Sequence, residues 1–304
     1  MRYIYSILFI IILSFTVKAQ RYSAIYSQYM LNGLAINPAY AGSRDCFSNV
    51  LLYRHQWMGF DGAPVTQVLS SHASLKNEKH AVGLTVLHEE IGELKNFDFY
   101  SNYAFRFRLG SGLFSLGLKA GVTIDQNNLN DISTGNGVDD PAFPNTVEKF
   151  VKPNFGVGVY YYNKKFFLGA SVPYLLSYGN EKFEMYHNIN NYDFLFTSGV
   201  LLSLAENFKL KPSVLGRYRL TGDYSVDASL SFIFFDALWL GGSYRFENEY
   251  SFRVQYQLNN QIRIGYAYDY PTGDIKDYNI NGSHEIILRY DFKYKIKAVN
   301  PRYF

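Results

Sequence analysis

Apolar and polar residues alternate along most of the chain after Phe47. In the stretch 251–258 one face carries Phe252, Val254, Tyr256 and Leu258, and the other carries Ser251, Arg253, Gln255 and Gln257. The same alternation continues through 261–270 and 284–294. A period of two over such lengths predicts β-strands with one apolar and one polar face.

Fourteen stretches of this kind can be placed between residues 46 and 294. They are 46–56, 66–74, 80–89, 96–109, 112–124, 154–162, 165–172, 192–205, 208–220, 224–235, 238–247, 251–258, 261–270 and 283–294. Many reach the roughly 9 to 11 residues that a tilted strand needs to cross a bilayer, and single-chain bacterial barrels have an even number of strands. The sequence therefore predicts an all-β fold, a transmembrane antiparallel β-barrel of about 14 strands. A soluble β-rich protein is the alternative.

The lengths of the connections support the membrane barrel. The connections after even-numbered strands are all short: 75–79, 110–111, 163–164, 206–207, 236–237 and 259–260. Every long connection follows an odd-numbered strand: 57–65, 125–153, 173–191 and 271–282. Short periplasmic turns and longer outer loops are typical of outer-membrane barrels. We therefore expect an outer-membrane protein, in contact with outer-membrane lipid, with both termini in the periplasm.

The two ends of the chain lie outside the strand pattern. Residues 1–19 combine a positive Arg2, a short apolar run and a small-x-small site at Val17-Lys18-Ala19, which predicts a cleaved signal peptide. A retained N-terminal anchor is the alternative. Residues 20–45 form an N-terminal segment that we expect to be either a short plug or a periplasmic strap. Residues 295–304 form a C-terminal tail.

Composition agrees with this picture. Tyr (28) and Phe (25) make up most of an aromatic share of 18%, and aromatic residues are enriched in strands and at the interfaces of membrane barrels. Removal of Arg2 and Lys18 with the signal peptide lowers the formal net charge from +3 to +1. This near-neutral balance argues against a nucleic-acid partner.

Known catalytic motifs are missing from the sequence. The six histidines are scattered, no G-x-S-x-G motif occurs, and Cys46 has no recognisable base partner. We therefore predict no enzyme, no catalytic residue, no cofactor, no metal site and no small-molecule substrate. The acidic connection 125–153 leaves two interpretations open, a solvated loop and a calcium-binding loop.

Several charged residues fall on the polar faces of the predicted strands and are expected to face the lumen. They are Arg106, Arg108, Arg217, Arg219, Arg245, Glu247 and Arg253. A ring of one sign would indicate ion selectivity, whereas this mixture indicates either internal ion pairing or a surface that grips a polypeptide.

Three sequence blocks carry a resemblance to a known family. Ser27-Gln28-Tyr29-Met30 precedes Asn37-Pro38-Ala39-Tyr40-Ala41-Gly42-Ser43. The second block is Tyr53-Arg54-His55-Gln56-Trp57-Met58-Gly59-Phe60-Asp61-Gly62-Ala63-Pro64, followed by Thr66-Gln67, and the chain ends in Asn300-Pro301-Arg302-Tyr303-Phe304. Together they resemble the PorP/SprF family of type IX secretion membrane proteins of Bacteroidetes. Asn300 stands where the family usually has serine.

The resemblance implies an outer-membrane component of type IX secretion and gliding. Its implied partners are components of that system and the C-terminal domain of an exported cargo protein, such as an adhesin. The motif residues available for partner binding or for loop structure are Asn37, Pro38, Tyr40, Gly42, Arg54, Gln56, Trp57, Gly59, Phe60, Gly62 and Pro64. We expect Trp57 and Phe60 to be available to pack inward. The alternative function is a 14-stranded uptake channel for small or hydrophobic solutes.

Overall fold

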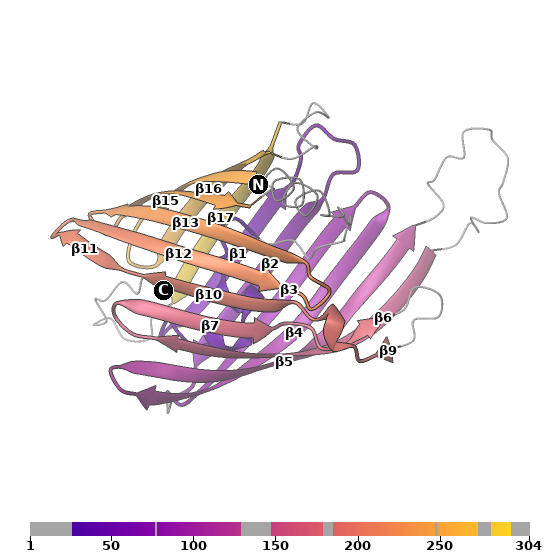
Figure 1. The fold of residues 1–304 in the computed structure, drawn as a ribbon, viewed down its shortest axis with the longest axis horizontal. Helices are drawn as coiled ribbons and strands as arrows, with labels where there is room; N and C mark the ends of the chain where they lie inside the picture. The colour runs from indigo at the N-terminus through magenta and orange to yellow at the C-terminus, as the bar shows by residue number, and fades with distance from the viewer. Residues whose placement is uncertain are drawn as a thin grey trace, which may run out of the picture.

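The strands of this protein form one closed antiparallel barrel (Figure 1). The computed structural model describes residues 26–76, 78–128, 147–178, 185–246, 249–272 and 281–292. The predicted signal peptide, C-terminal tail and Glu247 lie outside these residues. No helix in the described part of the chain is long and apolar enough to cross a membrane.

Fourteen barrel strands are present in the described residues. They are β1 (Phe47–His55), β2 (Val65–Ser74), β3 (His80–Ile91), β4 (Leu94–Leu109), β5 (Gly112–Asn128), β6 (Val147–Tyr162), β7 (Phe166–Val172), β10 (Phe194–Val200) with β11 (Leu202–Ala205), β12 (Phe208–Tyr218), β13 (Tyr224–Phe234), β14 (Leu238–Arg245), β15 (Glu249–Gln257), β16 (Ile262–Pro271) and β17 (Ser283–Phe292). Each strand pairs with the next along the chain, and β17 pairs with β1 to close the barrel. The predicted strand number and fold are confirmed.

Two expected boundaries are wrong. The predicted strand 192–205 is interrupted at Leu201, so that β10 and β11 both pair with β12 as two parts of one barrel strand. The predicted connection 125–153 is partly strand, because β5 and β6 stay paired as far as Asn128 and Val147. An ion pair between Lys152 and Asp125 joins these two strands and lets polar residues extend the hairpin.

Alternation of burial follows the predicted alternation of polarity. In β4 the even positions from Asp98 to Arg106 are buried and the odd positions are exposed. Many of the exposed strand positions are large apolar residues, including Leu118 at 58% and Phe252 at 61%. Since these faces are apolar and point away from the lumen, they are the lipid-facing surface.

Aromatic residues gather on this outer surface near the short turns. The strand register places Phe107 beside Phe114, Phe208 beside Phe234, and Phe47 beside Phe292. Such a row is the interfacial girdle of a membrane barrel. It marks one edge of the apolar band.

Connections between barrel strands differ at the two ends of the barrel. One end, the short-turn end, has tight connections such as the one between β4 and β5. The other, the long-loop end, includes the connection between β7 and β10, which contains the small hairpin β8 (Ser177–Tyr178) and β9 (Met185–Tyr186) and the 3-10 turn η3 (Ile189–Asn191). The short helix α2 (Gly33–Ile36) and the 3-10 turn η1 (Pro38–Tyr40) precede β1.

Candidate functional site: a chain segment inside the barrel

Residues 26–45, hereafter the inner segment, lie inside the barrel. Nearly all residues from Tyr26 to Ser43 are buried, and η1 contacts β4, β5 and β6. The segment starts near the long-loop ends of the strands and leaves near the short-turn end, where β1 begins. The described residues therefore form no periplasmic strap.

The first anchor of the inner segment is a buried ion cluster at the long-loop end. Arg54 of β1 is 2% exposed, and its Nη1 lies 2.5 Å from Asp269 Oδ2 and 3.2 Å from Glu285 Oε2. The Glu285 carboxylate accepts backbone hydrogen bonds from Ser27 (3.0 Å) and Gln28 (2.9 Å). The cluster thus clamps the main chain of the inner segment with charge-assisted hydrogen bonds.

Ser27 is held by three further contacts. Its hydroxyl donates to Asp269 Oδ2 at 2.6 Å and accepts from Arg54 Nη1 at 3.0 Å. Its carbonyl accepts from Arg253 Nη1 at 3.1 Å. Arg54, a residue of the family motif, and Arg253, a predicted lumen-facing charge, therefore both contact Ser27.

The second anchor uses Asn37 and a set of inward-facing glycines. Asn37 Nδ2 donates to the Val159 carbonyl at 2.9 Å, and Asn37 Oδ1 accepts from the Ala39 amide at 2.9 Å. A Cβ on Gly117 would lie 2.1 Å from Ala39 N, and one on Gly158 would lie 2.2 Å from Asn37 Oδ1. The inner segment rests directly on the backbone of β5 and β6, which only glycine permits.

The third anchor is at the short-turn end. Arg44 pairs with Asp291 at 3.0 Å, and His72 Nδ1 accepts from the Gly42 amide at 3.1 Å. Burial alone would lower the pKa of Arg44, but the nearby Asp291 carboxylate outweighs it and raises that pKa above its ordinary value. Arg106 donates to Asp45 at 3.1 Å and to Tyr162 at 3.0 Å. Gly42 has a φ of 73°, which favours glycine at this turn.

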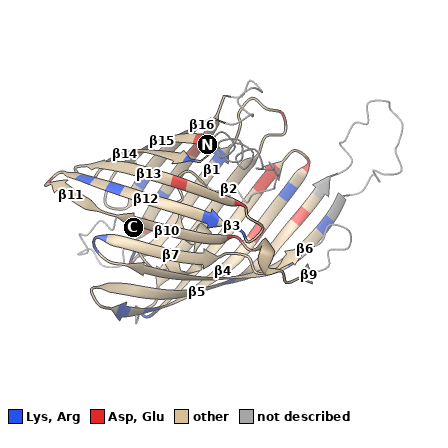
Figure 2. Cartoon of the chain, viewed as in Figure 1, with Lys and Arg blue, Asp and Glu red and all other residues tan. Residues whose placement is uncertain are grey.

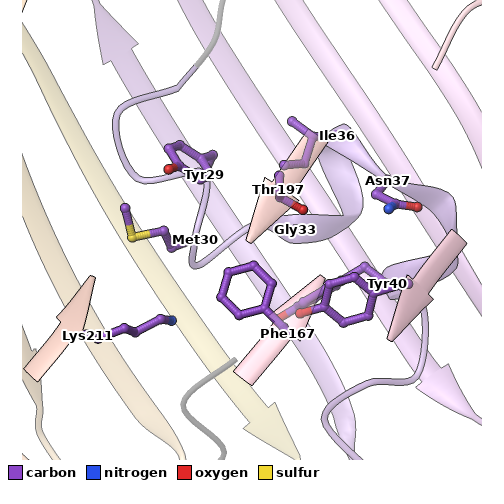
Figure 3. Close-up of a pocket in the computed structure, with 10 residues that line it drawn as sticks. Tyr29, Met30, Gly33, Ile36, Asn37, Tyr40, Phe167, Thr197 and Lys211 are labelled. Carbon is purple, nitrogen blue, oxygen red and sulfur yellow. The ribbon is translucent and has the colours of Figure 1, made fainter. Parts of the chain in front are cut away.

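Between these anchors the packing is apolar and close. Figure 3 shows Tyr29, Met30 and Tyr40 of the inner segment beside Phe167 and Lys211 of the barrel wall. The space among them is only about 30 Å³, which is room for one or two water molecules. Burial raises the pKa of Tyr29 above its ordinary value, so its hydroxyl stays neutral.

A larger cavity lies on the long-loop side of the inner segment. Its volume is about 520 Å³, and its floor includes Tyr26, Ala35 and Ile36 of the inner segment. Lys119 Nζ sits 4.1 Å from the Tyr100 ring centre and 4.0 Å from that of Tyr174, which is cation–π distance. The described lumen is therefore filled on one side and hollow on the other.

The structure separates the predicted lumen charges into distinct groups. Arg106, Arg217 and Arg253 are buried on inward faces. Arg219 pairs with Asp193 at 2.7 Å, and Arg245 pairs with Asp227 and Glu249. Arg108 has the same inward parity as Arg106 but is exposed at the end of β4, beyond the region that the inner segment fills. Figure 2 shows charged residues scattered singly along the mostly uncharged strands.

The first connection at the long-loop end, between β1 and β2, is tight. Gln56 N donates to the Pro64 carbonyl at 2.9 Å, and Gly59 and Gly62 have φ values of 98° and 74°. Met58 exchanges backbone hydrogen bonds with Asn281 and Gly282. Phe60 is 48% exposed, so the expectation that it packs inward is wrong, and Trp57 is half-buried.

Sequence reasoning missed several residues that hold the inner segment. Asp269 and Glu285 occupy polar positions of the alternating stretches 261–270 and 284–294, but that alternation does not show that they pair with Arg54. Gly117 and Gly158 interrupt apolar strands, which is a known sign of close backbone approach. The sequence therefore indicates a close approach at these glycines, but it does not show which segment of the chain approaches them.

Metal binding finds no support in the described residues. These residues contain no group of three or more His, Cys, Asp or Glu side chains that could hold a metal ion. Asp125, expected in the calcium loop, is in β5 and pairs with Lys152. Most of the predicted calcium loop lies outside the described residues.

Similar solved structures are barrels with little sequence identity. The monoaromatic hydrocarbon channel CymD has a TM-score of 0.50 and 9% identity over 89% of this chain and 94% of that one. The outer membrane protein Omp33 of Acinetobacter baumannii gives 0.48 and 9% over 82% and 98%. The outer membrane phospholipase A of Escherichia coli gives 0.36 and 12% over 82% and 97%. At these identities only the fold is shared, and the CymD likeness alone supports it.

The sequence comparison identifies the family of this protein, which the structural comparison does not. No curated protein matches this chain. The family described as "Type IX secretion system membrane protein PorP/SprF" matches residues 18–290. Because that match spans most of the chain, the protein belongs to the PorP/SprF family of type IX secretion system membrane proteins.

Proposed function

We propose that this barrel is a docking component of type IX secretion in the outer membrane. It binds or anchors an exported protein through that protein's C-terminal domain, and it links this cargo to other components of the system. Family membership supports a role in secretion rather than in catalysis. The long-loop end faces the cell exterior, in keeping with the usual orientation of outer-membrane barrels.

The inner segment is the observation that carries this proposal over an uptake channel. Hydrogen bonds to the buried ion cluster hold one end, the Arg44–Asp291 ion pair holds the other, and the inward-facing glycines of β5 and β6 receive its middle. A solute would have to displace buried charge pairs to pass, and breaking such pairs is costly. A barrel closed in this way suits binding better than transport.

Two measurements on the full-length barrel test the proposal. Gentle detergent purification from native cells should recover an exported protein with the barrel. The same preparation in planar bilayers should show almost no steady ion conductance. Robust solute flux into liposomes, with no exported protein bound, would instead establish the uptake channel.

A further inference from the structure

The cavity on the long-loop side of the inner segment is lined by equal numbers of acidic and basic residues. Among its lining residues three acids, Glu89, Asp98 and Asp193, are matched by three bases, Lys119, Lys152 and Arg217. No ring of one sign surrounds it. The cavity therefore lacks the field that selects an ion or a charged solute.

Charged groups of the cavity wall are also engaged with one another or with polar neighbours. Asp98 accepts hydrogen bonds from Thr123 (2.6 Å) and Tyr174 (3.3 Å), while Glu89 accepts from Thr66 at 3.2 Å. Lys152 pairs with Asp125. A charged ligand would have to break such pairs, whereas an uncharged one with donors and acceptors would not.

Apolar and aromatic surface completes the lining. Tyr26, Tyr100, Tyr174 and Tyr178 contribute rings, and Leu87 and Leu195 contribute aliphatic contacts. A volume of about 520 Å³ falls in the range of about 300 to 1,000 Å³ typical of ligand pockets. The lining therefore suits an occupant that offers both apolar contact and neutral hydrogen-bonding groups.

The rim of the cavity points to a protein as the occupant. Ser177 and Tyr178 of β8 line the cavity, and β8 pairs with β9, where Met185 is 59% exposed. Ile189, in the same connection, is 51% exposed. Aliphatic and methionine side chains next to an aromatic pocket are features of protein–protein interfaces.

We infer that this cavity receives an uncharged projection of the exported partner polypeptide, with the Met185–Ile189 rim contacting the partner around it. The inference rests on the proposed function and specifies where docking occurs. It places the inner segment as the floor of the binding site. The projection contacts the tyrosine rings and donates to or accepts from neutral groups of the wall.

Filling the cavity tests this assignment. Ala35→Trp fills it from the floor and Ser177→Trp from the wall, while Ala120→Trp, on the lipid face of β5, is the matched control. The probe is the exported protein that co-purifies with the unmodified barrel. We expect each cavity variant to retain at most about one tenth of the exported protein that the unmodified barrel retains. The control should retain as much as the unmodified barrel.

Heat-dependent electrophoretic mobility shows whether each variant is a folded barrel. If one cavity variant misfolds, the other still tests the assignment. Full retention by a folded Ala35→Trp or Ser177→Trp barrel overturns the cavity assignment but leaves docking itself intact. If the unmodified barrel retains no exported protein, both the assignment and the proposed function fail.

Charge substitutions test the neutral character separately. Ala35→Asp and Ala35→Lys place opposite charges at the cavity floor, and both should weaken retention, with Ala35→Ser close to unmodified. If one sign weakens retention and the other strengthens it, the projection is charged and the inference is wrong.

Discussion

At the residue scale, Arg54 connects the barrel wall to the chain inside it. On the same inward face it reaches Glu285 of the adjacent strand β17 and Asp269 of β16, and these carboxylates in turn hold Ser27 and Gln28. A buried arginine is stabilised only when such partners offset the loss of water. The position of Arg54 in the motif next to the β1–β2 connection is thus explained by a contact made inside the lumen.

Replacing Arg54 should destabilise the barrel. Arg54→Met leaves two buried carboxylates facing each other without a cation, so the free energy of unfolding should fall by roughly 3 to 5 kcal/mol. Urea unfolding in lipid vesicles, followed by tryptophan fluorescence, measures the change. The control is Arg108→Met at the exposed end of β4, which should stay within about 0.5 kcal/mol of the unmodified protein; equal effects of the two variants would contradict the role given to Arg54.

At the element scale, two strands are shaped to receive the inner segment. Gly117 and Gly158 face inward on β5 and β6, directly opposite each other in the register, where η1 approaches. Side chains at these positions would push η1 away from the sheet. The glycines are visible in the sequence, but the approaching element η1 lies 78 residues before Gly117 and 120 residues before Gly158, counted from Ala39 and Pro38.

Gly117→Ala should release the inner segment without unfolding the barrel. The added Cβ would lie 2.1 Å from Ala39 N, a backbone atom that cannot move independently. In a Cys46→Ser background, Leu34→Cys reports the release: Leu34 is 2% exposed, so maleimide labelling should be slow in the parent and much faster with Gly117→Ala. Gly216→Ala, where the nearest atom is 4.0 Å away, serves as the control. If Leu34→Cys is labelled as slowly with Gly117→Ala as with Gly216→Ala, Gly117 is not needed for the close approach of η1.

At the scale of the whole molecule, the barrel has two unlike ends. The long-loop end opens to the large cavity, and the short-turn end is closed by Arg44, Arg106 and their partners. The inner segment runs from one end to the other before β1 begins. This route places Tyr26 on the cavity side, not on the short-turn side.

The orientation in the membrane can be tested in intact cells. In the Cys46→Ser background, Ile189→Cys at the long-loop end should react with a membrane-impermeant maleimide, because long loops face outward in outer-membrane barrels. Asn260→Cys, exposed at a short turn, should react only after the outer membrane is opened. The reverse pattern would invert the proposed orientation and put the cavity in the periplasm.

The sequence by itself determined the barrel. Strict alternation in strands such as Ser251–Gln257 fixes which side chains meet lipid, and the even strand number and the sorting of loop lengths follow from local pattern alone. The family motifs around Asn37 and Arg54 were also legible without coordinates. Parity puts Arg108 on an inward face but does not predict its exposure at the end of β4, because parity says which way a side chain points and not how far the filled lumen extends.

Only the tertiary structure decided what the lumen contains. The contacts of Ser27 with Asp269 and of Gly42 with His72 join residues that alternation treats as independent, separated by up to 242 positions. A period of two shows which residues lie on the polar face of a strand. It does not show which of them pair, since any inward carboxylate could pair with any inward arginine. Closure of the barrel brings one particular set of these groups together around residues 26–45. That set holds the inner segment in the lumen and leaves a large cavity on its long-loop side.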